Sequence, residues 1–177
     1  MSKNSDNPII NDKTKGLVIE FIGGEPFLEI DLIETLCDYY IDKCLKEQSD
    51  WIKYTRFCIT SNGILYNTEK VQHFLKKFNQ WLSLNISIDG PKDIHDACRC
   101  FSDGRGSFDI ANAADKQFIN DYPSLGLFGT KATISPQNLI DIYRIIEFFV
   151  NEQKQNIFIN PIFEHNWTID QAQTYYN

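Results

Sequence analysis

Three short motifs in this chain combine glycine with a hydrogen-bonding side chain. They are Gly23-Gly24-Glu25-Pro26, Ser61-Asn62-Gly63 and Ser87-Ile88-Asp89-Gly90. Glycine leaves the backbone open to close approach by a ligand, while carboxylate, amide and hydroxyl oxygens accept hydrogen bonds from ligand ammonium and hydroxyl groups. These residue types suit the binding of a small polar ligand. Taken singly, Gly23-Gly24 and Asp89-Gly90 are also consistent with ordinary turns.

Each motif follows or ends an apolar run that predicts a buried β-strand. The runs cover residues 17–22, 57–60 and 84–88, and such near-continuous apolar runs are typical of strands covered on both faces. Amphipathic segments separate them, which is the pattern of successive βα units. Ligands of parallel α/β folds bind at the carboxyl ends of the strands. We therefore expect the polar side chains of the three motifs to meet at one rim of the sheet.

The rest of the chain continues this alternation. Apolar positions at helical spacing predict four helices that lie against the sheet. Their inward-facing residues are, in chain order, Leu32, Ile33, Leu36, Cys37, Tyr40, Ile41, Cys44 and Leu45 for the first helix; Val71, Phe74, Leu75 and Phe78 for the second; Ile110, Ala111, Ala114 and Phe118 for the third; and Leu139, Ile142, Tyr143, Ile146 and Phe149 for the fourth.

Two more strands are predicted at residues 129–134 and 157–163. The second is expected at a sheet edge, or to be bent, because it contains Pro161. Residues 91–106 predict a long irregular loop, which is usually a functional feature, and residues 168–171 predict a capping box.

Composition limits the class of protein. The 177 residues are 42% hydrophobic and carry a formal net charge of −7, which argues against sequence-independent binding of nucleic acid or of an anionic membrane. No apolar run approaches the length of a membrane span, and the amino terminus lacks the apolar core of a signal peptide. Five irregularly spaced cysteines favour a reducing compartment over a disulfide framework. We expect a cytoplasmic protein that binds neither nucleic acid nor membrane.

The ordered set of motifs resembles the radical S-adenosylmethionine (SAM) superfamily. Within it, the chain looks most like the peptide- and protein-modifying maturases related to anaerobic sulfatase maturases, of the SPASM type. The resemblance covers about residues 18–163 and, beside the three motifs above, includes His95-Asp96 with Arg99, Gly104-Arg105-Gly106-Ser107-Phe108 and Ala132-Thr133-Ile134-Ser135-Pro136. This ordered combination is far more specific than any single motif.

The resemblance implies a SAM-binding site. The implied cofactor-binding residues are Gly23, Gly24, Glu25, Pro26, Asn62, Ser87, Asp89 and Arg99. Glu25 would accept hydrogen bonds from the SAM ammonium group, while Asn62 and Ser87 suit its ribose hydroxyls or its carboxylate. Arg99 would fork onto that carboxylate through two parallel bonds. We expect Glu25, Asn62 and Ser87 to converge on this one ligand, and we assign no catalytic residue and no metal ligand within the chain.

The resemblance also implies an enzyme and a fold. In complete members of the family, a 4Fe-4S cluster reduces SAM to a 5′-deoxyadenosyl radical that abstracts a hydrogen atom from the substrate, and the protein places that radical. The implied partners are a peptide or protein substrate and a reductant such as a flavodoxin or ferredoxin. The implied fold class is α/β, a partial (β/α) barrel with five βα units of a six-stranded radical SAM core and the first strand missing.

One family feature is absent from the sequence. The CxxxCxxC motif that holds the cluster does not precede Gly23, and the first fifteen residues contain no cysteine. We therefore interpret the chain as a fragment, or a truncated gene product, of a larger enzyme. Residues 1–15 are expected to form a disordered polar tail and residues 16–177 a truncated radical SAM core domain. We expect the chain to be inactive alone.

Two other functions remain as alternatives. The first is a catalytically inactive scaffold that has lost the cluster and binds only SAM or a peptide. The second is an ordinary α/β barrel enzyme in which Gly23-Gly24 grips a phosphate; the order of the three motifs disfavours it. Gly104-Arg105-Gly106-Ser107 resembles a phosphate cradle but follows no strand directly, which favours a helix-entry turn.

Metal binding is the less favoured interpretation of the cysteines. Cys98 and Cys100 with His95 would provide three ligands in one loop with no fourth. Cys37 and Cys44 lie on a predicted apolar helix face and are interpreted as small buried side chains.

Overall fold

The computed structural model describes residues 16–123, 129–153, 156–163 and 166–176. The chain divides into two compact units, and each is described by itself. Unit 1 consists of the described residues of Met1–Thr60 together with Leu65–Leu84, and unit 2 consists of Ser61–Ile64 with the described residues of Asn85–Asn177. The tail predicted at residues 1–15 lies outside the described residues. The core domain proposed for residues 16–177 stays a prediction.

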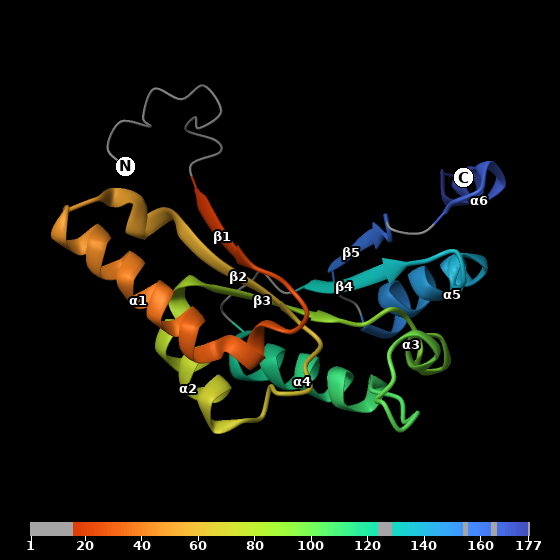
Figure 1. Cartoon of the computed structure of the whole chain (residues 1–177), viewed down its shortest axis with the longest axis horizontal. Coiled ribbons are helices and arrows are strands. Elements are labelled where there is room, and N and C mark those ends of the chain that lie inside the picture. The colour runs from red at the N-terminus through yellow and green to blue at the C-terminus, as the bar shows by residue number, and fades with distance from the viewer. Residues whose placement is uncertain (1–15, 124–128, 154–155, 164–165, 177) are drawn as a thin grey trace. The chain divides into compact units, whose positions relative to one another are not determined.

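The fold is α/β with five strands, which are β1 (Leu17–Phe21), β2 (Thr55–Ser61), β3 (Leu82–Ser87), β4 (Gly129–Ile134) and β5 (Asn156–Pro161). They follow the order β1-β2-β3-β4-β5, and the registers of β1 with β2, β3 with β4 and β4 with β5 are parallel (Figure 1). The predicted strands are confirmed, with limits that shift by up to two residues. The last strand ends at Pro161 on the edge of the sheet, where a missing backbone N–H is tolerated.

Unit 1 packs two helices side by side, α1 (Ile30–Lys46) and α2 (Glu69–Phe78) (Figure 1). Three short 3-10 turns join the elements, at η2 (Pro26–Glu29), η3 (Asp50–Tyr54) and η4 (Asn79–Trp81). Phe57 of β2 forms the centre of the core, because its ring meets Tyr40 of α1 and Phe78 of α2 edge-on, each with centroids 6.0 Å apart. Edge-to-face contacts of this kind add to the stabilisation from buried area.

Three of the eight residues of the apolar stripe predicted on α1 are exposed. Leu32, Leu36 and Leu45 are 55%, 46% and 62% exposed. The sequence pattern grouped adjacent positions as one stripe, but neighbouring residues point about 100° apart around a helix, so only one edge of so wide a stripe reaches the core. Cys37 and Cys44 lie on that edge and are buried, as predicted. Burial raises the pKa of the Cys37 thiol to about 12.

Unit 2 contains the helices α3 (Lys92–Cys98), α4 (Phe108–Asp121), α5 (Ile142–Glu147) and α6 (Ile169–Tyr176), with a 3-10 turn η6 (Leu139–Asp141) before α5 and a π-helical turn η7 (Phe148–Gln153) after it. The capping box predicted before α6 is confirmed. The Thr168 N–H donates to Gln171 Oε1 at 2.9 Å, and the Gln171 N–H donates to Thr168 Oγ1 at 3.2 Å. These two bonds satisfy donors that the helix start would otherwise leave unpaired.

Four expectations for unit 2 are wrong. The segment predicted to be irregular contains α3, and Ile110 of α4 is 43% exposed. Tyr143 and Ile146, predicted to face inward, are 72% and 39% exposed. The helix predicted from inward-facing residues that start at Leu139 begins only at Ile142, because Leu139 lies in a 3-10 turn. Because a 3-10 turn has fewer residues than an α-helical turn, it rotates the following positions away from the face that the sequence pattern indicated.

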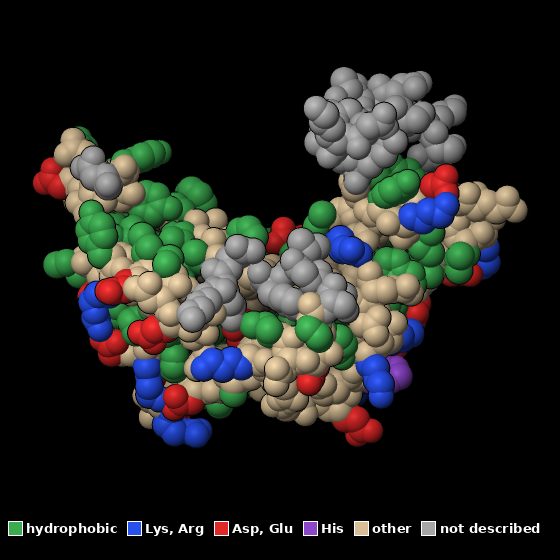
Figure 2. Space-filling model, turned by 180° about the vertical axis from the view of Figure 1, so that it is seen from behind, with side chains coloured by type: hydrophobic (Ala, Val, Ile, Leu, Met, Phe, Trp, Pro, Cys, Tyr) green, Lys and Arg blue, Asp and Glu red, His purple; other side chains and the backbone are tan. Residues whose placement is uncertain are grey.

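Exposed apolar side chains gather over β5, the segment after it and α6 in unit 2 (Figure 2). They are Phe158, Phe163, Ile169 and Tyr176. On unit 1 the helices instead carry charge pairs, such as Lys77 of α2 with Glu34 and Asp38 of α1. In the part of the chain that the structure describes, no helix combines the length and apolar character needed to span a bilayer.

The central position of Phe57 gives a test of the unit 1 core. Phe57→Ala is expected to lower the free energy of unfolding by about 3–5 kcal/mol, because it removes a fully buried ring and leaves a cavity. Urea denaturation followed by circular dichroism measures the change. The matched control is Phe163→Ala, whose ring is 85% exposed and which is expected to cost less than about 0.5 kcal/mol. Equal losses in both variants would contradict the packing described here.

Candidate functional site

The Gly23-Gly24-Glu25-Pro26 motif belongs to unit 1 and shapes the entry to η2. The Phe27 N–H donates to Glu25 Oε1 at 3.0 Å, and the Leu28 N–H donates to the Glu25 carbonyl at 3.2 Å. Pro26 occupies the start of this turn, where its lack of an N–H costs nothing. The Glu25 carboxylate is therefore oriented by its own chain as a cap.

Open space surrounds the two glycines. A Cβ atom built on Gly23 or Gly24 would meet no heavy atom within 4 Å, so packing does not require glycine at either position. In the same unit, the buried Thr60 hydroxyl near the end of β2 has no hydrogen-bond partner among the described residues. Bare backbone and an unsatisfied hydroxyl at strand ends are features that suit a bound polar ligand.

Asn62 lies in unit 2, in the turn after β2. Its Oδ1 accepts the Ile64 N–H at 2.9 Å, and Ser61 Oγ accepts the Gly63 N–H at 3.0 Å. Gly63 has φ +78°, and a Cβ there would approach the Ala111 Cα of α4 to 3.3 Å. Glycine is required at this position by both the backbone conformation and the close helix. The turn thus fixes Asn62 at the strand end.

Ser87 and Asp89 mark the end of β3, and both are buried, but they differ in their hydrogen bonds. The Ser87 hydroxyl forms no hydrogen bond with any residue that the structure describes. Asp89 is 2% exposed, and its carboxylate accepts Arg99 Nε at 2.5 Å, Arg99 Nη2 at 3.2 Å and the Thr133 N–H at 2.8 Å. Asp89 therefore fulfils an internal role, while Ser87 retains its hydrogen-bonding capacity for a ligand.

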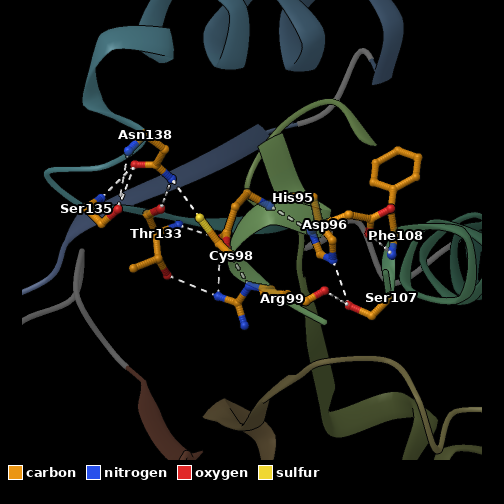
Figure 3. A network of polar contacts seen from close by, with 10 residues as sticks. His95, Asp96, Cys98, Arg99, Ser107, Phe108, Thr133, Ser135 and Asn138 are labelled. Carbon is orange, nitrogen blue, oxygen red and sulfur yellow. Dashed lines mark hydrogen bonds and ion pairs between the residues drawn. The ribbon is translucent and has the colours of Figure 1, made fainter. Parts of the chain in front are cut away.

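His95 of α3 connects this ion pair to the start of α4. The imidazole is fully buried. The Asp89 backbone N–H donates to His95 Nδ1 at 3.2 Å, and His95 Nε2 lies 3.0 Å from Ser107 Oγ. The Ser107 hydroxyl donates to the Arg99 carbonyl at 2.9 Å. Figure 3 shows Ser107 beside His95 and beside the backbone of Arg99, whose guanidinium points the other way, toward Thr133.

The protonation state of His95 follows from its two neighbours. A backbone N–H only donates, so Nδ1 accepts from Asp89 and the ring proton resides on Nε2, from where it is donated to Ser107. A neutral ring is consistent with its surroundings, because burial lowers the pKa of His95. The Asp89 and Asp96 carboxylates oppose this effect, and the Arg99 guanidinium adds to it.

The end of β4 is held by an amide side chain. Asn138 Oδ1 accepts the Ser135 N–H at 2.7 Å, and Asn138 Nδ2 donates to the Thr133 carbonyl at 3.1 Å (Figure 3). Thr133 also contacts Arg99, because Arg99 Nη2 donates to Thr133 Oγ1 at 3.3 Å. The buried Asn138 thus fixes the β4 backbone that donates to Asp89.

Of the predicted site residues, the structure brings Asp89 and Arg99 into direct contact, and Ser87 lies two residues before Asp89. The sequence did not indicate that the supporting residues His95, Ser107 and Asn138 belong to one network. The four-residue spacing of His95 and Arg99 was an available signal, because residues i and i+4 of a helix share a face. No such spacing links either of them to Ser107 or Asn138.

The described residues offer no cluster of three or more His, Cys, Asp or Glu side chains suited to a metal ion. Cys98 and Cys100 are free thiols, and burial raises the pKa of Cys98, which disfavours the thiolate that metals require. The donor set of this part of the chain does not fit a 4Fe-4S cluster.

Solved structures with a similar fold are those of anSMEcpe, an anaerobic sulfatase maturase. One, described with bound AdoMet and a Kp18Cys peptide, matches with a TM-score of 0.66 at 18% identity over 91% of this chain and 44% of that chain. Another, with bound AdoMet, gives a TM-score of 0.66 at 18% identity over 94% of this chain and 46% of that one. At this identity the likeness shows the fold. It confirms the predicted class, five βα units of a partial (β/α) barrel.

Sequence comparison adds two relatives, although no family model matches the chain. The radical SAM cyclopropyl synthase TigE of Paramaledivibacter caminithermalis is 34% identical over 99 residues, which are 56% of this chain and 18% of that protein. The resemblance to radical SAM enzymes is confirmed. An uncharacterized protein of Methanocaldococcus jannaschii is 32% identical over 106 residues, 60% of this chain and 33% of its own length. The match therefore spans less than half of the length of each of these two relatives.

The buried ion pair gives a second test. Asp89→Asn is expected to lower the free energy of unfolding by about 2–4 kcal/mol. The substitution leaves the partly buried Arg99 guanidinium without its counter-charge, and the new amide NH2 group would face N–H donors of Arg99 and Thr133. Thermal and urea unfolding measure this loss.

The same substitution at a surface pair provides the control. Asp93 contacts Arg144 at 2.9 Å, but their side chains are 64% and 53% exposed. Asp93→Asn is expected to change stability by less than about 1 kcal/mol. A loss at Asp89 no larger than the loss at Asp93 would show that the buried pair does not hold these elements.

Proposed function

We propose that this chain forms the SAM-binding part of a radical SAM enzyme that modifies a peptide or protein. The observation that carries the proposal is the set of polar groups at the strand ends of unit 2. There, the Ser87 hydroxyl has no hydrogen-bond partner among the described residues, and Asp89, two residues after Ser87, holds the Arg99 guanidinium. The confirmed resemblance to radical SAM enzymes gives the ligand class.

The chemistry of SAM matches the residues available. SAM carries a carboxylate, an ammonium, a sulfonium and ribose hydroxyls. The Arg99 guanidinium would bind the carboxylate by a charge-assisted hydrogen bond. Ser87 and Asn62 would donate to or accept from the ribose hydroxyls or the carboxylate, and Glu25 would accept from the ammonium. Bare backbone at Gly23 and Gly24, ahead of Pro26, would allow close approach of the ligand.

The structure changes one detail of the proposed Arg99 contact. Nε and Nη2 already donate to Asp89, and Nη2 also donates to Thr133. Among the described residues, Nη1 has no partner, and the Arg99 side chain is 30% exposed. Arg99 is therefore proposed to bind the SAM carboxylate through Nη1 alone, in place of the two parallel bonds expected from the sequence. Asp89 acts in this proposal by holding Arg99.

The radical chemistry depends on groups that this chain does not supply. When bound to SAM in complete family members, a reduced 4Fe-4S cluster provides the electron that yields the 5′-deoxyadenosyl radical. The cysteine motif for that cluster is not in the sequence, so this chain is proposed to be inactive alone and to bind and orient SAM. A peptide or protein substrate and a reductant such as a flavodoxin or ferredoxin complete the proposed system.

Ser87→Ala and Glu25→Ala test the proposed site. Ser87→Ala is expected to weaken SAM binding by about 0.5–1.5 kcal/mol, the net contribution of one neutral hydrogen bond, and Glu25→Ala by about 1–3 kcal/mol, because its partner is charged. Isothermal titration calorimetry of SAM into the complete protein measures both changes.

Ser87→Ala is the easier of the two variants to interpret, because the Ser87 hydroxyl forms no hydrogen bond with a described residue that the substitution would remove. Ser102→Ala, in an exposed loop of the same unit, is the matched control and is expected to leave the affinity unchanged. Unchanged affinity in both Ser87→Ala and Glu25→Ala would refute the proposed site.

A further inference from the structure

We propose that His95 is a positioning residue that, through Ser107, holds Arg99 in the orientation needed to bind an anionic ligand group. The inference rests on the proposed function for the identity of that group, the SAM carboxylate. In this proposal the buried His95 contacts neither SAM nor a metal ion. His95 would act only through Arg99.

The hydrogen bonds around His95 form a closed ring. The Asp89 N–H donates to His95 Nδ1 at 3.2 Å, and His95 Nε2–H donates to Ser107 Oγ at 3.0 Å. The Ser107 hydroxyl donates to the Arg99 carbonyl at 2.9 Å. The Arg99 guanidinium closes the ring, because its Nε donates to the Asp89 carboxylate at 2.5 Å. The direction of every bond is fixed, because the ring begins at an N–H that only donates and passes through a carbonyl that only accepts.

Arg99 needs such support because it stands outside regular structure. It follows the last residue of α3, with φ −127° and ψ 91°. The Arg99 N–H still donates to the His95 carbonyl at 2.7 Å, and the Ser107 N–H donates to the Arg99 carbonyl at 3.2 Å. The Ser107 hydroxyl adds the second bond to that carbonyl. A long side chain loses much rotamer freedom when it is fixed. Because the Arg99 backbone is already held in place, less conformational entropy is lost when the guanidinium becomes ordered on ligand binding.

An imidazole fits this position better than other side chains. The ring must accept at one end and donate at the other across a fixed separation, and a neutral imidazole does both in one rigid plane. The ring also packs edge-on against Phe108 of α4, with centroids 5.6 Å apart. Phe108 is itself fixed, because its N–H donates to Asp96 Oδ1 at 2.8 Å. His95 thus joins α3 to α4 one helical turn before Arg99, which follows the end of α3.

Protonation of His95 would open the ring. A proton on Nδ1 would face the Asp89 N–H, and two donors repel each other. The charged groups that act on the imidazole are Asp89, Arg99 and Asp96; from α4 it meets the uncharged Ser107 and Phe108. Because burial lowers the pKa of His95 below its ordinary value of about 6.5, the neutral ring is present at pH 7 and is lost as the pH falls through the lowered pKa.

The test compares SAM affinity in the complete protein for His95→Phe, Ser107→Ala and Arg99→Met. His95→Phe keeps the ring shape but removes both bonds, and Ser107→Ala removes the link without altering the histidine. Each is expected to weaken SAM binding by about tenfold, the effect of one lost hydrogen bond, and Arg99→Met by at least as much. His73→Gln is the matched control, because the His73 side chain, on α2, is 68% exposed. This variant is expected to bind SAM with unchanged affinity.

Two further readouts separate positioning from a general loss of structure. The affinity of the wild type for SAM should be constant above pH 7 and should fall as His95 protonates at acid pH. The Ser107→Ala variant should already bind SAM weakly at neutral pH, and its affinity should fall less as the pH is lowered. Nuclear magnetic resonance of the Arg99 Nε–H, without SAM, should show a slowly exchanging proton in the wild type and faster exchange in Ser107→Ala.

The outcomes distinguish this inference from the proposed function. Loss of affinity in Arg99→Met with unchanged affinity in Ser107→Ala and His95→Phe would overturn the role of His95 while leaving the SAM site intact. Unchanged affinity in Arg99→Met would overturn the assignment of Arg99 and, with it, this inference. Equal Arg99 Nε–H exchange in the wild type and Ser107→Ala would refute the ring as a positioning device, whatever the affinities.

Discussion

A single buried carboxylate imposes the main constraint on unit 2. Removing the Asp89 charge from water costs several kcal/mol unless charged or hydrogen-bonding partners compensate for it. The compensation comes from the Arg99 guanidinium after α3 and from the Thr133 N–H in β4. Because these donors belong to different elements, satisfying one carboxylate at the end of β3 fixes the loop after α3 and the end of β4 together.

That constraint separates structural groups from groups left for a ligand. Asp89, His95 and Ser107 form hydrogen bonds with one another or with backbone groups. Asn138 likewise forms a hydrogen bond with the backbone of β4. The Ser87 hydroxyl and Arg99 Nη1 remain, since neither forms a hydrogen bond with a described residue. A network whose members are all satisfied is rigid, and rigidity is what a binding residue such as Arg99 requires. In unit 1, the open backbone at Gly23-Gly24 offers a comparable opportunity.

Much of the fold was predictable from the sequence because it depends on local patterns. The apolar runs before Gly23, Ser61 and Asp89 gave the strands, since buried parallel strands need no alternation of polar residues. Helix faces were harder to predict. Leu36 lies beside the buried Cys37 yet is 46% exposed, because the extent of burial depends on which neighbours pack against the helix.

The candidate site was predictable only as a set of residues. The ordered motifs named Asp89 and Arg99 through a family resemblance, but both were expected to face a cofactor, and the structure instead joins them to each other. The link through His95 to Ser107 spans twelve residues of sequence and carries no periodic signal. Such contacts depend on how α3 meets α4, which single-sequence patterns do not encode.

The most direct test of this account is a crystal structure of the complete protein with SAM. The account predicts that the SAM carboxylate lies within hydrogen-bonding distance of Arg99 Nη1, that Ser87 contacts SAM, and that Asp89 keeps its bonds to Arg99. A structure in which SAM contacts neither Ser87 nor Arg99, or in which Arg99 leaves Asp89 to reach the ligand, would contradict it.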